Sequence, residues 1–146
     1  MMKLLHIKKL NFLLILLCLF LLAIDRLTKL IITKNTCNFI FCFKPTINEF
    51  AVFSLPIPMI VILVISILIL IATPILFFKI KEILPKISFI LIFSGTLGNL
   101  IDRVFYGHVI DFLTFSFWQS FPVFNFADVL NLAGVILLII TLFKKE

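Results

Sequence analysis

The sequence predicts an all-α membrane protein with four transmembrane helices and a small strand region in the first outer loop. Hydrophobic residues make up 63% of the 146 residues and charged residues only 14%, a composition that does not fit a soluble globule. Apolar runs of about 17–25 residues are typical of helices that cross a bilayer. We expect four such spans in a single membrane domain covering residues 1–146, at about residues 10–32, 57–78, 87–104 and 126–143.

The first apolar run looks like a secretory signal peptide, because three lysines precede the almost wholly apolar stretch from Phe12 to Ile24. No small-x-small cleavage site follows it. A lipoprotein cleavage motif ending at Cys18 also fails, since Leu17 occupies a position that needs a small residue. We therefore interpret the run as the first transmembrane helix, in which Cys18 packs as a small hydrophobic residue.

The later spans are separated by short polar segments. Residues 57–78 carry no charge, and Pro58 suits the start of this helix, whereas Pro74 is expected to kink it near its far end. A basic link at residues 79–86 leads to the third span. The fourth span ends in two lysines, which marks its return to the aqueous phase.

Two longer loops carry the remaining polar sequence. In the first, residues 33–55, the stretch Asn38–Phe43 reads as a short strand, and a second strand around Phe50–Ser54 is consistent with the pattern. The second loop, residues 102–125, is rich in aromatic side chains. Such rings favour the interface between lipid headgroups and water, so both loops are expected at a membrane surface.

Cys37 and Cys42 lie in the first loop and leave two interpretations open. They form a disulfide if the loop faces an oxidising compartment, or they remain two free thiols, which is the state that we favour. No C-x-x-C motif is present, so neither zinc binding nor redox catalysis is indicated.

The basic residues cluster at the ends of the apolar runs and act as topology determinants. Eight of them lie in the two termini and the 79–86 link, and five lie on the other side of the membrane. The positive-inside rule therefore places both termini and the link in the cytoplasm and the two longer loops outside. The net charge of +6 forms no face or stripe, so nucleic acid is not an expected partner.

Two aspartates, Asp111 and Asp128, lie in apolar sequence, where an ionised carboxylate costs at least a few kcal/mol. Two carboxylates within about 3 Å share a proton, so one can act as base and the other as acid in water-mediated amide hydrolysis. The alternative is that each aspartate only caps a helix. The other polar residues at this outer depth are Asp25, Lys29, Asn48, Asn99, Asp102, Arg103 and Asn125.

Several of these residues are spaced to share a helical face. Asn125 precedes Asp128 by three positions and either orients a carboxylate or serves as the N-cap of the last span. Asn99 and Arg103 are four apart. Arg103 either binds a carbonyl or lipid phosphate oxygen, or it pairs with Asp102 or reaches the headgroups.

Asp25 and Lys29, also four apart, end the first span. They either form an ion pair along the helix, or Asp25 supports loop backbone near the site. Other chemistries have less support. No H-E-x-x-H motif and no Gly-rich phosphate loop is present, and nothing singles out a serine–lysine pair, so no metal or cofactor is expected.

Taken together and in this order, five motifs resemble those of lipoprotein signal peptidase, also called signal peptidase II, over nearly the whole chain. They are Asp25-Arg26-Leu27-Thr28-Lys29, Asn48-Glu49-Phe50-Ala51-Val52-Phe53-Ser54, Ser94-Gly95-Thr96-Leu97-Gly98-Asn99-Leu100-Ile101-Asp102-Arg103, Gly107-His108-Val109-Ile110-Asp111-Phe112 and Phe121-Pro122-Val123-Phe124-Asn125-Phe126-Ala127-Asp128. One departure is Phe50, at a position where the family usually has a glycine, which permits positive φ or close backbone approach.

The resemblance implies a membrane aspartyl endopeptidase that cuts prolipoproteins before a diacylglyceryl-modified cysteine, with a small β-cradle after the first span. It places the catalytic pair at Asp111 and Asp128. Supporting residues fall at Asp25, Asn48, Asn99, Arg103 and Asn125, to which we add Lys29. The expected partners are the lipid-modified prolipoprotein and membrane lipids. The resemblance also implies inhibition by the cyclic peptide globomycin.

We expect a monomer in the bacterial cytoplasmic (inner) membrane, with its active site near the outer face. The competing class is a non-enzymatic membrane protein, a transporter or scaffold, whose outer polar residues line a pathway. Substitution of either Asp111 or Asp128 separates the two classes, because only the peptidase loses cleavage of a lipid-modified precursor.

Overall fold

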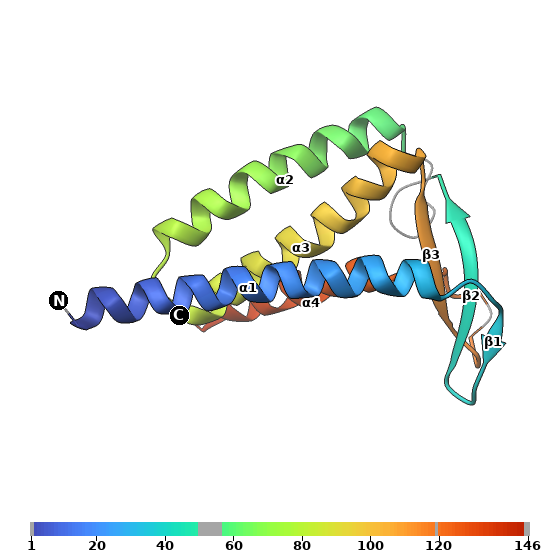
Figure 1. The fold of residues 1–146 in the computed structure, drawn as a ribbon, viewed down its shortest axis with the longest axis horizontal. Helices are drawn as coiled ribbons and strands as arrows, with labels where there is room; N and C mark the ends of the chain where they lie inside the picture. Colours follow the sequence, from blue (N-terminus) through green and yellow to red (C-terminus); the bar gives the residue numbers. More distant parts are fainter. Residues whose placement is uncertain (1, 50–56, 119, 145–146) are drawn as a thin grey trace.

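The computed structural model describes residues 2–49, 57–118 and 120–144. Within these residues the chain forms four long helices and one small antiparallel sheet (Figure 1). The helices are α1 (Met2–Ile31), α2 (Met59–Lys79), α3 (Ile83–Tyr106) and α4 (Phe126–Phe143). The strands are β1 (Thr36–Cys37), β2 (Phe41–Asn48) and β3 (Val109–Phe115). The predicted fold class, a mostly helical membrane protein with a small β-element after the first span, is confirmed.

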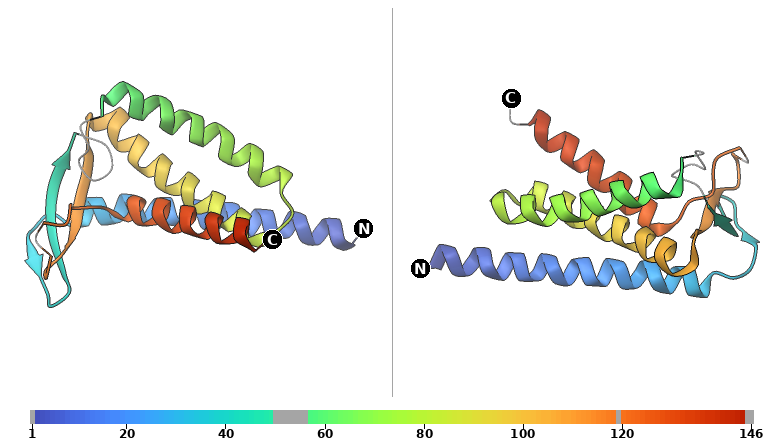
Figure 2. Two further views of the ribbon diagram at one scale, coloured as in Figure 1. Left: turned by 180° about the vertical axis from the view of Figure 1, so that it is seen from behind. Right: turned by 90° about the horizontal axis from the view of Figure 1, so that it is seen from above.

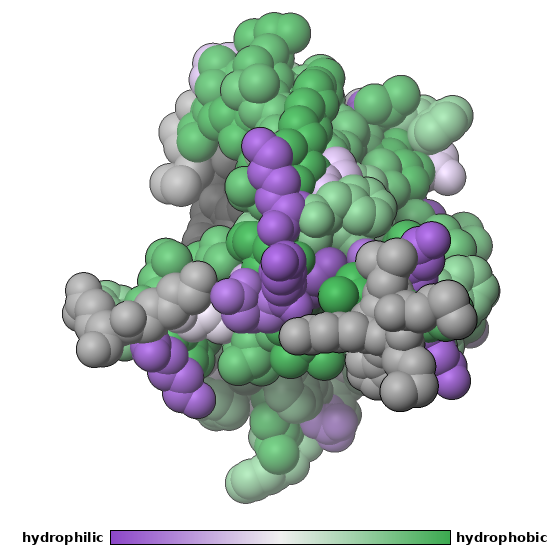
Figure 3. Space-filling model, turned by 90° about the vertical axis from the view of Figure 1, so that its left-hand side faces the viewer, coloured by the Kyte–Doolittle hydropathy of each residue, from purple (hydrophilic) through white to green (hydrophobic). Residues whose placement is uncertain are grey.

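Helix α3 is the centre of the bundle, since it packs against each of the other three helices. In the part of the chain that the structure describes, all four helices are long and apolar enough to cross a membrane. Of the apolar stretch of α3, 56% is buried inside the protein, against 11–22% for the other three. The outward faces of α1, α2 and α4 are therefore suited to lipid. Seen from the end of the bundle that holds the N-terminus, hydrophobic side chains surround a group of hydrophilic ones in the middle (Figure 3).

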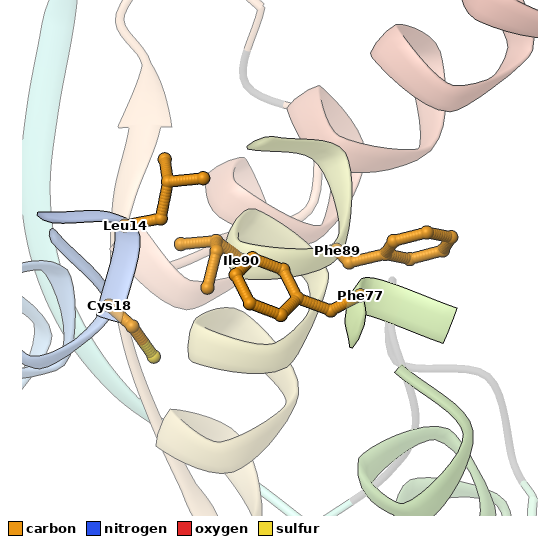
Figure 4. Close-up of a cluster of buried hydrophobic side chains, with 5 residues drawn as sticks. All are labelled: Leu14, Cys18, Phe77, Phe89 and Ile90. Carbon is orange, nitrogen blue, oxygen red and sulfur yellow. The ribbon is translucent and has the colours of Figure 1, made fainter. Parts of the chain in front are cut away.

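Helices α1, α2 and α3 meet in an apolar cluster, which packs the bundle far from the sheet (Figure 4). Cys18 is a free thiol buried in this cluster, as predicted, and the Ser94 hydroxyl lies 3.2 Å from its sulfur. Inside a bilayer such packing supplies van der Waals contact rather than removal from water. The members of the cluster are Leu14, Cys18, Phe77, Phe89 and Ile90.

Lys86, expected in the basic link, lies instead in the first turn of α3, because this helix begins at Ile83. Its side chain is buried. The ammonium donates to Asn11 Oδ1 over 2.6 Å and lies 4.3 Å from the centre of the Phe77 ring. A buried ammonium needs such partners, since an unpaired buried charge is expensive. Lys86 therefore ties α3 to both α1 and α2.

The sheet has the order β1-β2-β3, and both strand pairs are antiparallel. The predicted strand at Asn38–Phe43 is wrong in its first half. The Asn38 side chain accepts hydrogen bonds from the backbone N–H groups of Ile40 and Phe41, so the chain turns there, between β1 and β2. The possible strand at Phe50–Ser54 lies outside the described residues.

Cys37 and Cys42 are opposite one another on β1 and β2 and form a disulfide, with their Cα atoms 4.0 Å apart. The expectation of two free thiols is therefore wrong. The turn at residues 38–40 brings the two cysteines into cross-strand register, which spacing along the chain did not reveal. Disulfides persist in oxidising compartments.

The segment 102–125, expected as a loop, contains strand β3. Helix α3 ends at Tyr106, and Gly107 adopts a left-handed conformation with φ of 75°, which reverses the chain. The strands then run across the end of the helix bundle rather than along it (Figures 1 and 2). This arrangement brings β3 against α3 and α1 and within hydrogen-bond distance of Asn125, the N-cap of α4.

Candidate active site

A group of polar side chains from four elements meets where the sheet covers the helix ends. Asp111 comes from β3, Asp128 from the first turn of α4, and Asn125 from the N-cap of the same helix. Asn99 comes from α3 and Asn48 from the end of β2. These residues lie far apart in the chain, and the fold brings together the two aspartates that the sequence singled out.

Asp111 is buried, with 2% of its surface exposed, and both of its carboxylate oxygens are hydrogen-bonded. Oδ1 accepts from Asn125 Nδ2 over 2.6 Å, and Oδ2 accepts from Asn48 Nδ2 over 2.7 Å. Burial, followed by the negative charge of Asp128, raises the pKa of Asp111 to about 6. The two amide hydrogen bonds and the positive charge of Lys29 act in the opposite direction. Asp111 is therefore poised to exchange a proton near neutral pH.

Asp128 is the third residue of α4 and forms a capping box with Asn125. Its Oδ2 accepts from the backbone N–H of Asn125 over 3.1 Å, and the Asn125 side chain accepts from the backbone N–H of Asp128 over 2.9 Å. The other carboxylate oxygen accepts from Asn99 Nδ2 over 2.8 Å. Capping and orientation of a carboxylate, treated as alternatives in the sequence, are therefore combined in the same residues.

Asn125 is fully buried and bridges the two aspartates. Its carbonyl oxygen faces the backbone N–H of Asp128, so its amide nitrogen must point the other way, toward Asp111. The same nitrogen also lies 3.1 Å from Asn99 Oδ1. One side chain thus starts helix α4 and fixes an oxygen of Asp111.

The amide of Asn99 has its orientation set by Lys29. The ammonium of Lys29 can only donate, and it lies 3.1 Å from Asn99 Oδ1. The oxygen must therefore face Lys29, which leaves the NH2 group to donate to Asp128. Because Asn99 makes three hydrogen bonds within the protein, its contacts favour support of Asp128 over direct contact with a substrate.

An ion-pair network lies directly behind Asn99. Lys29 Nζ is 3.0 Å from Asp25 Oδ2 and 2.7 Å from Asp102 Oδ2. Arg26 bridges the same two aspartates and donates to the backbone carbonyl of Gly98 over 2.8 Å. Removing one member of such a buried network costs about 3–5 kcal/mol, because it strands the opposite charge. The network anchors α1 to α3 beside the site.

Asp25 forms the ion pair considered for it, and it also contacts the backbone of a helix rather than that of a loop. It pairs with Lys29 along α1, and its Oδ1 accepts from the backbone N–H of Ala127 over 3.1 Å, which holds the first turn of α4. Gly98 permits this approach, since a Cβ there would lie 2.7 Å from Asp25 Oδ2. Close packing of α1, α3 and α4 thus depends on a missing side chain at residue 98.

Arg103 lies one turn beyond Asn99, at the sheet end of α3, and is half-buried. Its guanidinium contacts the backbone carbonyl of Asn99 over 3.4 Å and is close enough to both Asp111 and Asp128 for a favourable electrostatic interaction. Its planar guanidinium is a fork of donors that suits a carbonyl or phosphate oxygen.

Two members of the site escaped sequence reasoning. Arg26 was not singled out, and Asp102 was considered only as a partner of Arg103, whereas it pairs with Arg26 and Lys29. The sequence did contain a signal for this network. Two acidic and two basic residues lie at one membrane depth, and unpaired charges are costly there, so the four are expected to pair. Phe50 lies outside the described residues. Within the described residues, no group of three or more His, Cys, Asp or Glu side chains is arranged to hold a metal ion.

The sequence model of the family described as signal peptidase (SPase) II, Peptidase_A8, matches residues 17–144. The chain belongs to the signal peptidase II family. Its relatives include proteins named lipoprotein signal peptidase. That of Clostridium tetani is 52% identical over 63 residues, which cover 42% of this chain and 40% of the relative. That of Staphylococcus aureus is 45% identical over 84 residues, covering 56% and 52%. The chain thus matches about half of the length of these curated relatives, or less.

Solved structures extend the likeness of this signal peptidase II family member to the whole fold. One, described as a bacterial membrane enzyme determined by the in meso method at 2.3 Å, has a TM-score of 0.78 and 34% sequence identity. The similarity covers 90% of this chain and 87% of that one. A second, at 1.9 Å, has a TM-score of 0.76 and 33% identity, and the match covers 91% and 94%. The arrangement of helices and sheet is thus that of known bacterial membrane enzymes.

Proposed function

We propose that the protein is an aspartic endopeptidase of bacterial membranes that removes signal peptides from prolipoproteins, with Asp111 and Asp128 as its catalytic residues. The observation that carries this proposal is the bridge through Asn125, whose side-chain amide donates to the Asp111 carboxylate and whose backbone N–H donates to that of Asp128. Family membership and the whole-fold likeness to bacterial membrane enzymes support it. A purely structural pair of helix caps would not need Asp111, which lies on a strand.

In the proposed mechanism the two carboxylates share one proton and hold a water molecule between them. The ionised carboxylate takes a proton from the water, whose oxygen bonds to the scissile carbonyl carbon. The protonated carboxyl gives its proton to the carbonyl oxygen. The carboxylates then reverse roles: one recovers the proton from the hydroxyl as the carbonyl re-forms, the carbon–nitrogen bond breaks, and the other protonates the leaving amine. No covalent bond to the enzyme forms.

The neighbouring residues act by keeping the pair in this state. Asn48 and Asn125 donate to Asp111, and Asn99 donates to Asp128, so each carboxylate keeps one fixed orientation. Asp25 and Lys29 hold the helix ends that carry these groups. Preorganised donors of this kind lower the barrier because they need not reorient during the reaction.

The substrate we assign is a prolipoprotein with a diacylglyceryl-modified cysteine, cut on the N-terminal side of that cysteine. The site lies at the ends of apolar helices, so the acyl chains can remain in the bilayer while the peptide bond reaches the aspartates. Arg103 is suited to hold a substrate carbonyl or a lipid phosphate oxygen through its planar fork of donors.

The proposed topology has both termini and the α2–α3 connection in the cytoplasm and the sheet at the outer face of the cytoplasmic membrane. The distribution of basic residues supports it, and so does the Cys37–Cys42 disulfide, which suits an oxidising outer compartment. We further propose that the enzyme acts as a monomer and that globomycin blocks it.

The test is cleavage of a lipid-modified precursor by Asp111→Asn and Asp128→Asn variants that still insert in the membrane. We expect each to lose about 10²–10⁴-fold in kcat, since each removes an acid–base group. Glu49→Gln is the matched control, because Glu49 is an exposed carboxylate next to Asn48, and it should retain activity. Retained cleavage in both aspartate variants would refute the dyad and favour a transporter or scaffold.

A second test concerns lipid recognition. A precursor that lacks the diacylglyceryl group should be a poor substrate, because it loses the part that partitions into the bilayer beside the site. Both precursors are compared by kcat/KM in the same reconstituted membranes. Equal turnover of the two forms would argue against lipid recognition while leaving the peptidase assignment intact.

A further inference from the structure

The end of the sheet that is farthest from α3 carries exposed aromatic and aliphatic side chains. We name them the aromatic tip: Phe39 and Ile40 from the β1–β2 turn, and Phe117 and Trp118 from the chain just after β3. Their exposed fractions are 96%, 49%, 72% and 54%. Ser116 joins the two halves, since its backbone N–H donates to the carbonyl of Ile40 and its hydroxyl to that of Phe39.

The aromatic tip is held in place by packed rings behind it. The ring of Phe115 lies 5.3 Å from that of Phe117 and 5.4 Å from that of Phe41, on the neighbouring strand. The Trp118 ring lies 5.0 Å from Phe121, which itself contacts Phe115 at 5.1 Å. Rings at these separations pack favourably. The exposure of the tip is therefore a fixed feature of the sheet rather than a loose end.

The aromatic end of the sheet lies on a face that looks toward the ends of the helices. Successive side chains on a strand alternate between faces, so Asp111 and Phe115 lie on the same face of β3. Asp111 on that face reaches Asn125 at the start of α4, so the face looks toward the helix ends. Figures 1 and 2 show the strands crossing the helix axes, with the β1–β2 turn lying beyond α1 and α4. The tip thus overhangs the region beside the bundle.

In a bilayer that region is lipid. Aromatic rings are favoured at the boundary between headgroups and acyl chains, whereas exposure of four large apolar side chains to water is unfavourable. We propose that the aromatic tip inserts into the headgroup–acyl boundary of the leaflet that faces the sheet. This contact anchors the sheet, and with it Asp111, at the membrane. The inference rests on the proposed function only for its effect on turnover. The membrane contact itself does not require activity.

The chain contains a single tryptophan, so Trp118 reports the position of the tip without further labelling. The full-length protein is reconstituted in vesicles of phosphatidylcholine and phosphatidylglycerol whose acyl chains carry bromine near the headgroup or near the methyl end. We expect Trp118 fluorescence to be quenched most by the shallow bromines and little by aqueous iodide. Strong quenching by iodide with none by brominated lipid would overturn the proposal and indicate a tip in water or against a protein partner.

A second experiment measures the effect of the tip on turnover with the double variant Phe39→Ser, Phe117→Ser. Both phenylalanines are exposed, and neither belongs to a paired strand. We expect KM for the membrane-borne precursor to rise by roughly three- to tenfold with kcat nearly unchanged, since loss of two exposed rings that would enter the headgroup region weakens membrane docking by up to about tenfold. Ile47→Ser is the matched control. Ile47 is an exposed apolar residue of β2 paired with Ile110, on the opposite face from Asp111.

The control should leave both KM and Trp118 quenching as in the parent protein. Unchanged KM in the double variant would show that the tip has no part in docking, even if it touches lipid. If the aspartate variants described above kept activity, the peptidase assignment would fail, but shallow quenching of Trp118 would still stand. The two proposals can therefore fail separately.

Discussion

Lys29 Nζ lies 3.1 Å from Asn99 Oδ1, and this contact decides which end of the Asn99 amide faces Asp128. A charge on the first helix is thereby coupled to a carboxylate on the last through a single side chain. The same ammonium is held by Asp25 and Asp102. The state of the carboxylate pair therefore depends on an ion network that does not itself touch a substrate.

The pH dependence of cleavage follows from the pKa of Asp111, which burial and the charge of Asp128 raise to about 6. Below that value the pair retains the proton that the mechanism needs. Above it Asp111 ionises, and no acid remains to protonate the carbonyl oxygen. We expect kcat/KM to fall as pH rises through about 6, by about tenfold per unit well above it. Activity that rises steadily from pH 6 to 8 would contradict this assignment.

Replacing Lys29 by glutamine should shift the fall of kcat/KM with rising pH to a higher pH. The positive charge of Lys29 lowers the pKa of Asp111, so its removal raises this pKa while the glutamine amide can still donate to Asn99. The variant should also lose about 3–5 kcal/mol of stability, because Asp25 and Asp102 lose a partner. The measurement is the pH profile of kcat/KM.

The control for this change is Lys29→Arg. It keeps the positive charge, so kcat/KM should fall at the same pH as in the parent protein. A merely structural role for Lys29 would lower activity equally at every pH in the glutamine variant. If kcat/KM of the glutamine variant fell at the same pH as in the parent protein, electrostatic coupling of Lys29 to Asp111 would be ruled out.

Asn125 allows folding and catalysis to be tested separately. Asn125→Ser keeps an N-cap oxygen for the backbone N–H of Asp128 but loses the amide that reaches Asp111. We expect near-parent stability and a kcat lower by roughly 10²-fold or more, as for loss of one preorganised donor. Asn125→Ala should add a loss of about 0.5–2 kcal/mol in stability from the missing cap. Equal stability of the two variants would contradict the capping role.

The Cys37–Cys42 disulfide predicts a labelling pattern in intact membranes. A membrane-impermeant maleimide should react at residues 37 and 42 only after reduction, whereas buried Cys18 should stay unlabelled throughout. The double variant Cys37→Ser, Cys42→Ser should destabilise the sheet by about 2 kcal/mol, the cost of opening a short loop. Labelling without a reductant would show that the two thiols are free.

The helices could be predicted from the sequence because each is a long apolar run, and nothing else in the chain competes with that pattern. Strand β3 could not. Its residues are buried or half-buried on both faces. The alternation of polar and apolar residues that marks a half-buried strand is therefore missing from Val109 to Phe115. The helix boundaries were less clear: α3 begins at Ile83, earlier than expected, and includes Lys86, whose charge is buried and paired with Asn11.

The sequence predicted which residues belong to the candidate site better than it predicted the contacts between them. Costly polar residues at one depth pointed to Asp111, Asp128, Asn99 and Asn125, and the structure brings all four together. The role of Arg26 depends on partners that are more than seventy positions away, Asp102 and the carbonyl of Gly98. Local spacing carries no information about such contacts, so only the fold reveals them.

The capping box at Asn125 and Asp128 also has a consequence for the order of biosynthesis. Asp111 is made before the last helix, yet the donor to its Oδ1 and its carboxylate partner both belong to the first turn of α4. Until that helix is inserted and its first turn has formed, Asp111 in a nascent chain lacks both Asn125 and Asp128. Completion of the proposed site therefore requires insertion of α4, so we expect a growing chain to be inactive until this helix is in place.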